Sequence, residues 1–242
     1  MSKTLVAILI TVILAVSFLA AAKIFSDTAI SIKNKGYVKV KGFAKQEIKS
    51  DLGIFKAKLA TEGADLKLCY KNLKEDKDKT NDFLKNFGVK EAEIEMFPVQ
   101  VVEEYKINER GHETDEFVKY ILKQKFKIEL SDVKKIAALS EKISELLDKG
   151  VKISAYEPKY VYTNLDDLKV EMIGKATANA KERAKIIAKQ GSFRLGPIAS
   201  VRVGVFQITP AHSTRVSGYG INDTSSIDKE IKSVVEIEYF VK

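Results

Sequence analysis

Hydrophobic positions recur with two different periods from Gly36 onward, and each period predicts one kind of element. Apolar and polar side chains alternate after Gly36, which predicts a strand, and the alternation returns at about Leu52–Thr61. A helix then begins at the N-cap residue Asp65, carries an apolar stripe that includes Cys69, and ends at Gly88. This part of the chain is therefore expected to form two strands and a helix.

A second set of strands and a helix follows in the pattern. Strand-like runs at about Glu93–Ile107 and Glu116–Leu130 flank a polar hairpin loop, and a helix is expected over Ser131–Gly150. Alternation resumes over Val151–Thr163. From the second strand onward the order is strand-helix-strand-strand-helix-strand, which is the ferredoxin-like split βαβ core of an α+β protein.

A long helix is expected to follow this core. Asn164 is a suitable N-cap, and Ala176, Ala180 and Ala184 lie four residues apart on one face. Small side chains on one face let a helix lie close against a sheet. Gly191 comes after the last turn, where we expect it to adopt the left-handed conformation of a C′ residue.

A C-terminal strand pair, at about Ile198–Ile208 and Ile227–Val241, completes the predicted fold. The connection between these strands, Thr209–Ser226, is long for a compact domain, and loops of this length are often functional or mobile. We therefore expect any ligand to bind in this 209–226 loop. The candidate ligand-binding residues are Arg215, Tyr219, Asn222 and Asp223.

Catalytic motifs do not accompany this loop. His212 precedes Ser213, but adjacent residues rarely hold the geometry of a nucleophile and its base, and the chain has no G-x-S-x-G elbow. Gly218-Tyr219-Gly220 lacks the preceding strand and following helix of a phosphate-binding loop. The sequence therefore predicts no catalytic residue and no enzyme, and a hydrolase that uses this loop is the weakest of our hypotheses.

Composition narrows the chemistry further. The 242 residues carry a formal net charge of +8, two histidines and one cysteine. A single cysteine excludes an intrachain disulfide, and we expect Cys69 to be buried and inert. So few histidines and cysteines argue against a zinc site, although a site made only of carboxylates stays open. The lysines are interleaved with acidic residues and Trp is absent, so we predict no metal, no cofactor and no nucleic acid, and leave an anionic partner open.

The N-terminal run Leu5–Ala22 is uncharged and mostly apolar, so residues 1–22 are either a secretory signal peptide or a single membrane anchor. Small residues at 20–22 suit a signal peptidase, whereas the unbroken run suits an anchor, which we favour slightly. Residues 23–35 form a linker and residues 36–242 form the folded domain. Lysines beyond the run place the body in the cytoplasm by the positive-inside rule, whereas the short N-terminal tail and the alanines favour export.

The chain resembles the SIMPL-domain family, the group that includes bacterial periplasmic immunogenic antigens. The resemblance covers about Gly36–Lys242 and rests on the order and spacing of several segments. After the N-terminal export segment, these are Val38–Ala44 followed by Asp51, a central pair of strands before the second helix, the alanine-rich helix ending in Gly191–Ile198, and the closing strand Ser233–Tyr239.

The resemblance implies an exported α+β domain that often self-associates, is linked in some bacteria to stress tolerance, and has no enzyme activity or catalytic residues. We therefore expect a periplasmic or extracytoplasmic protein, exported or tethered to the inner membrane through residues 5–22, that forms a homo-oligomer and supports envelope integrity. The alternative is a binding module for an anionic envelope ligand, small or polymeric, held through the 209–226 loop by Arg215 and neighbouring lysines.

Overall fold

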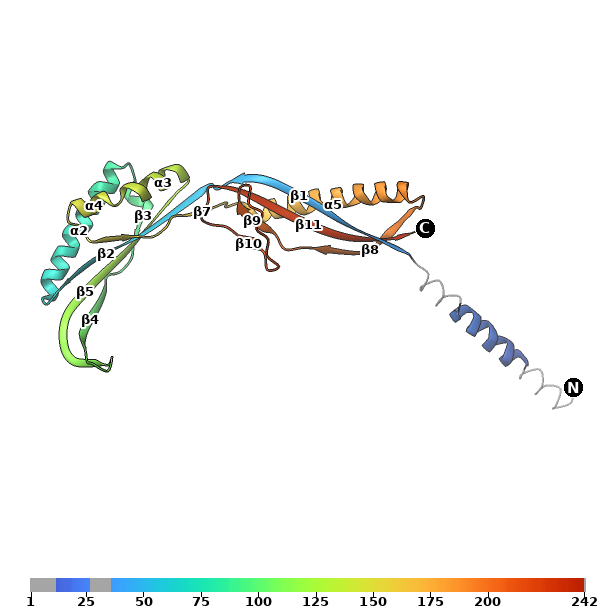
Figure 1. Ribbon diagram of the computed structural model, residues 1–242, viewed down its shortest axis with the longest axis horizontal. Helices are drawn as coiled ribbons and strands as arrows, with labels where there is room; N and C mark the ends of the chain where they lie inside the picture. The colour runs from blue at the N-terminus through green and yellow to red at the C-terminus, as the bar shows by residue number, and fades with distance from the viewer. Residues whose placement is uncertain (1–11, 27–35, 242) are drawn as a thin grey trace. The chain divides into compact units, whose positions relative to one another are not determined.

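The computed structural model describes residues 12–26 and 36–241 (Figure 1). Its elements are sheets and several helices, so the predicted α+β class is confirmed. The chain divides into two compact units. Unit 1 comprises Met1–Ala44, Glu171–Gly204 and Ser233–Lys242, and unit 2 comprises Lys45–Val170 and Val205–Lys232.

Unit 2 is built on a six-stranded sheet in which every pairing is antiparallel. Two long strands form its centre, with β5 paired to β3 and β4 on one side and β2 paired to β6 and β7 on the other (Figure 1). The strands are β2 (Leu52–Gly63), β3 (Ile94–Met96), β4 (Gln100–Ile107), β5 (Glu113–Leu130), β6 (Ile153–Ala155) and β7 (Lys159–Val161).

Three helices of unit 2 contribute to one hydrophobic core with this sheet: α2 (Leu66–Asn86), α3 (Val133–Lys142) and α4 (Glu145–Asp148). The alternate residues Phe55 and Leu59 of β2 are fully buried in it, as is Ile136 of α3. The Asp65 carboxylate caps α2 by accepting hydrogen bonds from two backbone amides, at 2.7 and 3.0 Å. Gly88, with φ of 87°, follows α2 in the left-handed conformation, as its predicted role as a helix stop requires.

Two of the predicted strands are interrupted by proline. The expected strand Glu93–Ile107 is divided into β3 and β4 around Pro98, and the expected strand Val151–Thr163 is divided into β6 and β7 around Pro158. Proline cannot donate to a ladder, so it ends each pairing locally. The predicted helix over Ser131–Gly150 is likewise two helices, α3 and α4.

In unit 1, one helix covers a sheet made from the two ends of the folded chain. Here β1 (Tyr37–Lys49) neighbours β11 (Asp228–Val241), and β11 pairs antiparallel with β8 (Leu195–Val203) (Figure 1). The part of α5 (Leu165–Gln190) from Glu171 onward belongs to this unit, and its alanines 176, 180 and 184 are fully buried, as the sequence predicts.

The end of α5 differs from the expectation. Gly191 does not take a positive φ; Ser192 does, with φ of 55°, so the prediction of a left-handed Gly191 is wrong. A Cβ on Gly191 would lie 2.6 Å from the ring of Phe193 and 3.2 Å from the Ile187 carbonyl oxygen. Glycine is therefore needed here because the aromatic ring folds back onto the helix end.

The predicted C-terminal strand Ile198–Ile208 is also two strands. β8 pairs with β11 at Val235–Val241, within unit 1. The next strand, β9 (Gln207–Pro210), pairs with β11 at Lys229–Lys232, and β10 (Ile221–Asn222) adds to β9 in parallel, both within unit 2. The long connection predicted over Thr209–Ser226 therefore contains a short strand of its own.

The expected N-terminal segment lies only partly within the described residues. Residues 12–26 are helical and exposed, whereas residues 5–11 of the predicted apolar run and residues 27–35 of the predicted linker lie outside the described residues. Among the residues that are described, no helix combines the length and apolar character needed to cross a bilayer.

Candidate functional site

The 209–226 loop is tied to the strands of unit 2 by polar side chains. Gln207 donates from its amide nitrogen to the Ser217 carbonyl oxygen at 2.8 Å and accepts from the Ser217 amide at 3.1 Å. Lys232 donates to the Ser213 carbonyl oxygen at 2.7 Å, and the backbone amide of Asp223 donates to the Ile208 carbonyl oxygen at 2.9 Å. The loop therefore has a defined course along β9 and β11.

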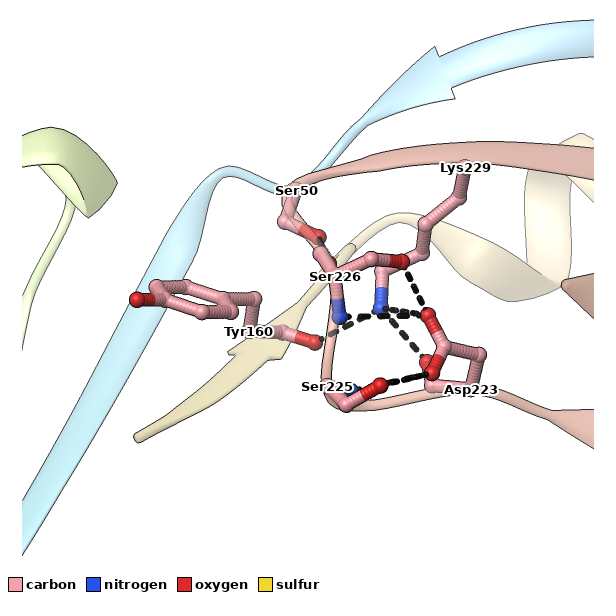
Figure 2. Close-up of polar contacts among 6 residues, drawn as sticks. All are labelled: Ser50, Tyr160, Asp223, Ser225, Ser226 and Lys229. Carbon is pink, nitrogen blue, oxygen red and sulfur yellow. Dashed lines mark hydrogen bonds and ion pairs between the residues drawn. The ribbon is translucent and has the colours of Figure 1, made fainter. Parts of the chain in front are cut away.

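A buried ion pair closes the C-terminal end of this loop (Figure 2). The Lys229 ammonium lies 3.3 Å from Oδ2 of Asp223, and the two side chains are 1% and 9% exposed. Lys229 also donates to the backbone carbonyl oxygens of Asp223, at 2.5 Å, and Tyr160, at 3.0 Å. Figure 2 shows the Tyr160 ring turned away, so β7 contributes only its backbone to the lysine.

Besides the ion pair with Lys229, the carboxylate of Asp223 accepts hydrogen bonds from its own loop. Oδ1 accepts from the amide and hydroxyl of Ser225, at 3.0 and 2.7 Å. Oδ2 accepts from the amide of Ser226, at 3.2 Å, and from the Ser226 hydroxyl. Ser50 adds a hydrogen bond to the Ser226 carbonyl oxygen at 3.3 Å, which joins the connection between β1 and β2 to the loop. We call these residues, with Lys229 and Tyr160, the loop latch.

Electrostatics favours the charged form of Asp223 despite its burial. Burial raises the pKa of its carboxyl group, but the hydrogen bonds from Ser226 and Ser225 and the charge of Lys229 outweigh burial and hold that pKa well below its usual range. Burial lowers the pKa of Lys229, and the nearby Asp223 opposes that shift. All three ammonium protons of Lys229 have acceptors, so the loop latch holds structure together and has no donor to spare for a substrate.

The structure separates the four predicted ligand-binding residues. Tyr219 and Asn222 are exposed and line one cavity of about 430 Å³. Asp223 lies in the loop latch, and the exposed Arg215 does not line that cavity. An external ligand at Asp223 has to displace hydrogen bonds that are already satisfied, so the loop does not assemble the four residues into one site.

The histidine of the loop has an unusual backbone conformation and precedes a local turn. His212 is exposed and has φ of 63°. The neighbouring Ser213 hydroxyl accepts from the Arg215 amide at 3.2 Å, as in a local turn. In the described part of the chain, no group of three or more His, Cys, Asp or Glu side chains is arranged to hold a metal ion.

Lys229 is the residue of this region that the sequence reasoning missed. In β11 it shares its parity with Ile231, Val235 and Ile237, all of which are buried. A lysine on the inward face of a strand, in line with buried apolar residues, indicates a buried partner, because burying a lone charge is costly. That signal was present in the alternation, but the identity of the partner depends on the course of the loop.

The model of the SIMPL family, described as a protein of unknown function (DUF541), matches residues 38–238. A search of curated proteins gives no match. The matched range includes β2 to β10 with the helices between them, and most of β1 and β11.

Proposed function

The chain belongs to the SIMPL family, and we propose that it is a non-enzymatic protein that assembles with copies of itself through the free edge of β8. The observation that carries this proposal is the contrast between the two edges of the sheet in unit 1. One edge is capped by side chains of α5, and the other pairs with no further strand among the described residues.

The capped edge is that of β1. Asn179 of α5 accepts a hydrogen bond from the Phe43 amide at 3.0 Å, and Arg183 donates to the Lys41 carbonyl oxygen at 3.1 Å. These bonds occupy backbone groups of β1 that would otherwise be available to pair with another strand. Proteins commonly cover exposed edges in this way, because an unpaired edge is a template for pairing with another chain.

The open edge is that of β8, which pairs only with β11 among the described strands. The Gly204 amide donates to the Val234 carbonyl oxygen at 2.9 Å, which makes this a hydrogen-bonded pair of the ladder. Because bonded and non-bonded pairs alternate in an antiparallel ladder, the pairs of Val201 and Val203 with β11 are non-bonded. The amides and carbonyls of these two valines therefore point away from β11, toward the free edge.

The side chains at this edge add apolar area to the free backbone groups. Val201 and Val203 lie opposite Ile237 and Val235, which are buried on the sheet face that packs against α5. Nevertheless, Val201 and Val203 are 51% and 48% exposed, and Ile198 is 53% exposed. A strand from a second copy, added beside β8, gains main-chain hydrogen bonds and covers these side chains. Closed cyclic symmetry is the expected form of such an assembly.

Light scattering coupled to size exclusion tests the assembly. The full chain, measured over a range of protein and salt concentrations, is expected to give a mass of at least two chains. Apolar and main-chain contacts depend weakly on salt, so the assembly is expected to persist as the ionic strength rises. A single-chain mass under every condition overturns the proposal.

We also propose that the assembly works outside the cytoplasm, tethered through residues 5–22 or exported, and that it supports the envelope under stress. The family resemblance and the apolar N-terminal run support this placement, and the lysines beyond that run oppose it. A periplasmic reporter fused after Lys242 is expected to be active, whereas activity of a cytoplasmic reporter alone contradicts the placement.

For unit 2 we propose the ferredoxin-like split βαβ topology. The order of pairing, with β3 and β4 beside β5, then β2, then β6 and β7, supports it, as do helices α2 and α3 between the strands. A fold with this arrangement carries many different functions, so the topology alone assigns none.

The alternative function, binding of an anionic envelope ligand through the 209–226 loop, has less support. Arg215 is exposed and does not share the cavity of Tyr219 and Asn222, and Asp223 would repel an anion. Replacement of Arg215 by Ala is therefore expected to leave the mass of the assembly unchanged.

A further inference from the structure

The sheet of unit 2 carries a dense row of lysines on the face opposite its helices. Phe55, Ala57 and Leu59 of β2 point into the core, so the residues between them point to the other face. On that face Lys56 lies directly opposite Lys127 of β5, and Lys58 lies opposite Lys125. Like charges in directly opposite positions of an antiparallel pair are destabilising.

Acidic neighbours neutralise only part of this row. Lys127 is held by Glu95 at 2.6 Å and by Glu129 at 3.1 Å. Lys119, further along β5, is held by Glu62 at 2.8 Å and by Glu104 at 3.4 Å. By contrast, the described residues provide no ion pair or side-chain hydrogen bond for Lys56, Lys58, Lys125 or Lys159. Lys123, opposite Ala60 on the same face, also has no ion pair among the described residues, so the unneutralised positive charge extends from Lys123 to the end of the face that carries Lys56 and Lys159.

A cavity of about 530 Å³ lies over this end of the sheet. Ile54 and Lys56 of β2, Lys125 of β5 and Lys159 of β7 contribute to its lining. Two aromatic side chains also line it, and they come from the two opposite edges of the sheet: Phe97 follows β3, and Tyr156 follows β6.

Both aromatic residues are fixed by the backbone next to a proline. The Phe97 amide donates to the Lys125 carbonyl oxygen at 3.0 Å, and the Tyr156 amide donates to the Lys56 carbonyl oxygen at 3.0 Å. Gln124 adds a bond from its side-chain amide to the Phe97 carbonyl oxygen at 3.0 Å. The strand breaks at Pro98 and Pro158 follow, so the kinks that interrupt the predicted strands also place the rings beside the lysines.

We propose that this cavity binds a small organic anion that carries a flat apolar ring, such as an aryl phosphate or aryl carboxylate. Pockets of about 300–1,000 Å³ with aromatic walls and a few charged groups are typical of small-ligand sites. The lysines neutralise the anionic group, and the ring lies between Phe97 and Tyr156. Lys125 of the lining lies opposite Lys58, so an anion bound at Lys125 offsets part of the like charge there, and binding stabilises the fold.

Glu157 is the acidic residue of the cavity lining, beside three lysines. The Glu157 carboxylate repels the anion, so the affinity is expected to be lower than the lysines alone would give. A polymeric anion is a different proposal, because this cavity of about 530 Å³ has the size of a small-ligand site and aromatic side chains in its lining. This inference is independent of assembly through β8.

Titration calorimetry of the full chain with 1-naphthyl phosphate tests the site, with neutral 1-naphthol and inorganic phosphate as comparison probes. We expect one naphthyl phosphate per chain, and binding of each comparison probe about tenfold weaker or more. Binding is expected to weaken as salt rises, because the lysines are partly exposed. Equal affinity for 1-naphthol, or no detectable binding of naphthyl phosphate, overturns the proposal.

Variants locate the binding. Lys56→Gln/Lys125→Gln is expected to weaken naphthyl phosphate binding about tenfold, whereas Lys71→Gln/Lys74→Gln, which removes the same charge from an exposed face of α2, changes it less than about twofold. Glu157→Gln is expected to tighten binding and Phe97→Ala to weaken it. The lysine variant removes a like-charge contact, so its melting temperature is not expected to fall. Equal losses in the two double variants, or weaker binding after Glu157→Gln, contradict the site.

Discussion

Gly42 of β1 lies directly against the backbone of α5 at Ala176. A Cβ on Gly42 would lie 2.0 Å from the Ala176 carbonyl oxygen and 2.5 Å from the Ala180 backbone nitrogen. Neither atom is the end of a flexible side chain, so any substituent at Gly42 pushes the helix away from the sheet. The buried alanines 176, 180 and 184 and this glycine together set the distance between the helix and the sheet.

Replacement of Gly42 by Ala is therefore expected to lower the free energy of unfolding by about 2–3 kcal/mol. Gly174→Ala provides a matched control, since nothing lies within 4 Å of its Cβ position and the residue is inside α5. That change is expected to stabilise by about 0.5–1 kcal/mol, because glycine disfavours a helix interior. Urea unfolding of both variants measures the difference, and equal effects contradict the close packing.

The loop latch predicts a strong energetic coupling between Asp223 and Lys229. Lys229→Met leaves the Asp223 carboxylate without its cation and is expected to cost about 3 kcal/mol. Asp223→Asn is expected to cost less, because its single amide oxygen still accepts from Ser225 and Lys229 keeps two backbone carbonyl acceptors, those of Asp223 and Tyr160. A double-mutant cycle by urea unfolding measures the coupling, and the double variant is expected to lose less than the sum of the single losses. If the loss of the double variant equals the sum of the two single losses, Asp223 and Lys229 are not energetically coupled, which contradicts the prediction.

Acid is expected to destabilise the loop latch through Asp223. The folded pKa of this carboxyl group lies below its unfolded value of about 4, so its contribution to stability is present above that pH. The contribution is lost as pH falls from the unfolded pKa toward the folded one. Between pH 7 and pH 3, the free energy of unfolding is therefore expected to fall more steeply for the wild type than for Asp223→Asn. Parallel curves contradict this assignment, since other carboxylates act equally in both proteins.

Cys69 is expected to be unreactive in the folded protein. It is 2% exposed in the core of unit 2, where Sγ lies 3.1 Å from the Cβ position of Gly63. A thiol reagent such as dithiobis(nitrobenzoate) is expected to label it only after denaturation, with one equivalent per chain. Rapid labelling of the native protein shows that this part of the core opens.

The sequence predicts most helices and strands, but it does not predict the breaks within strands or the end of α5. The helix caps at Asp65 and Gly88 and the buried alanine face of α5 follow from local residue preferences and period, so they were accessible. The strand breaks at Pro98 and Pro158 were also readable from proline, although the alternation on each side masked them. The backbone conformation of Gly191 depends on where the Phe193 ring packs, and no local sequence pattern predicts that packing.

The candidate sites show the same limit. The long loop makes Asp223 a candidate from the sequence, but its role depends on Lys229, which the fold brings next to it. The lysines of β2 and β5 repeat with period two in the sequence, and each strand alone reads as a solvated face. Only the register of the two strands places Lys58 opposite Lys125.

Assembly through the β8 edge is the central claim, and a charge placed at that edge tests it most directly. Val201→Lys puts an ammonium at the free edge, where charged residues prevent strand pairing. Val216→Lys, at a 76% exposed position in the 209–226 loop, is the matched control. Light scattering of the full chains is expected to give a single-chain mass for Val201→Lys and the wild-type mass for Val216→Lys. A wild-type mass for a correctly folded Val201→Lys, or dissociation caused by Val216→Lys alone, contradicts the account.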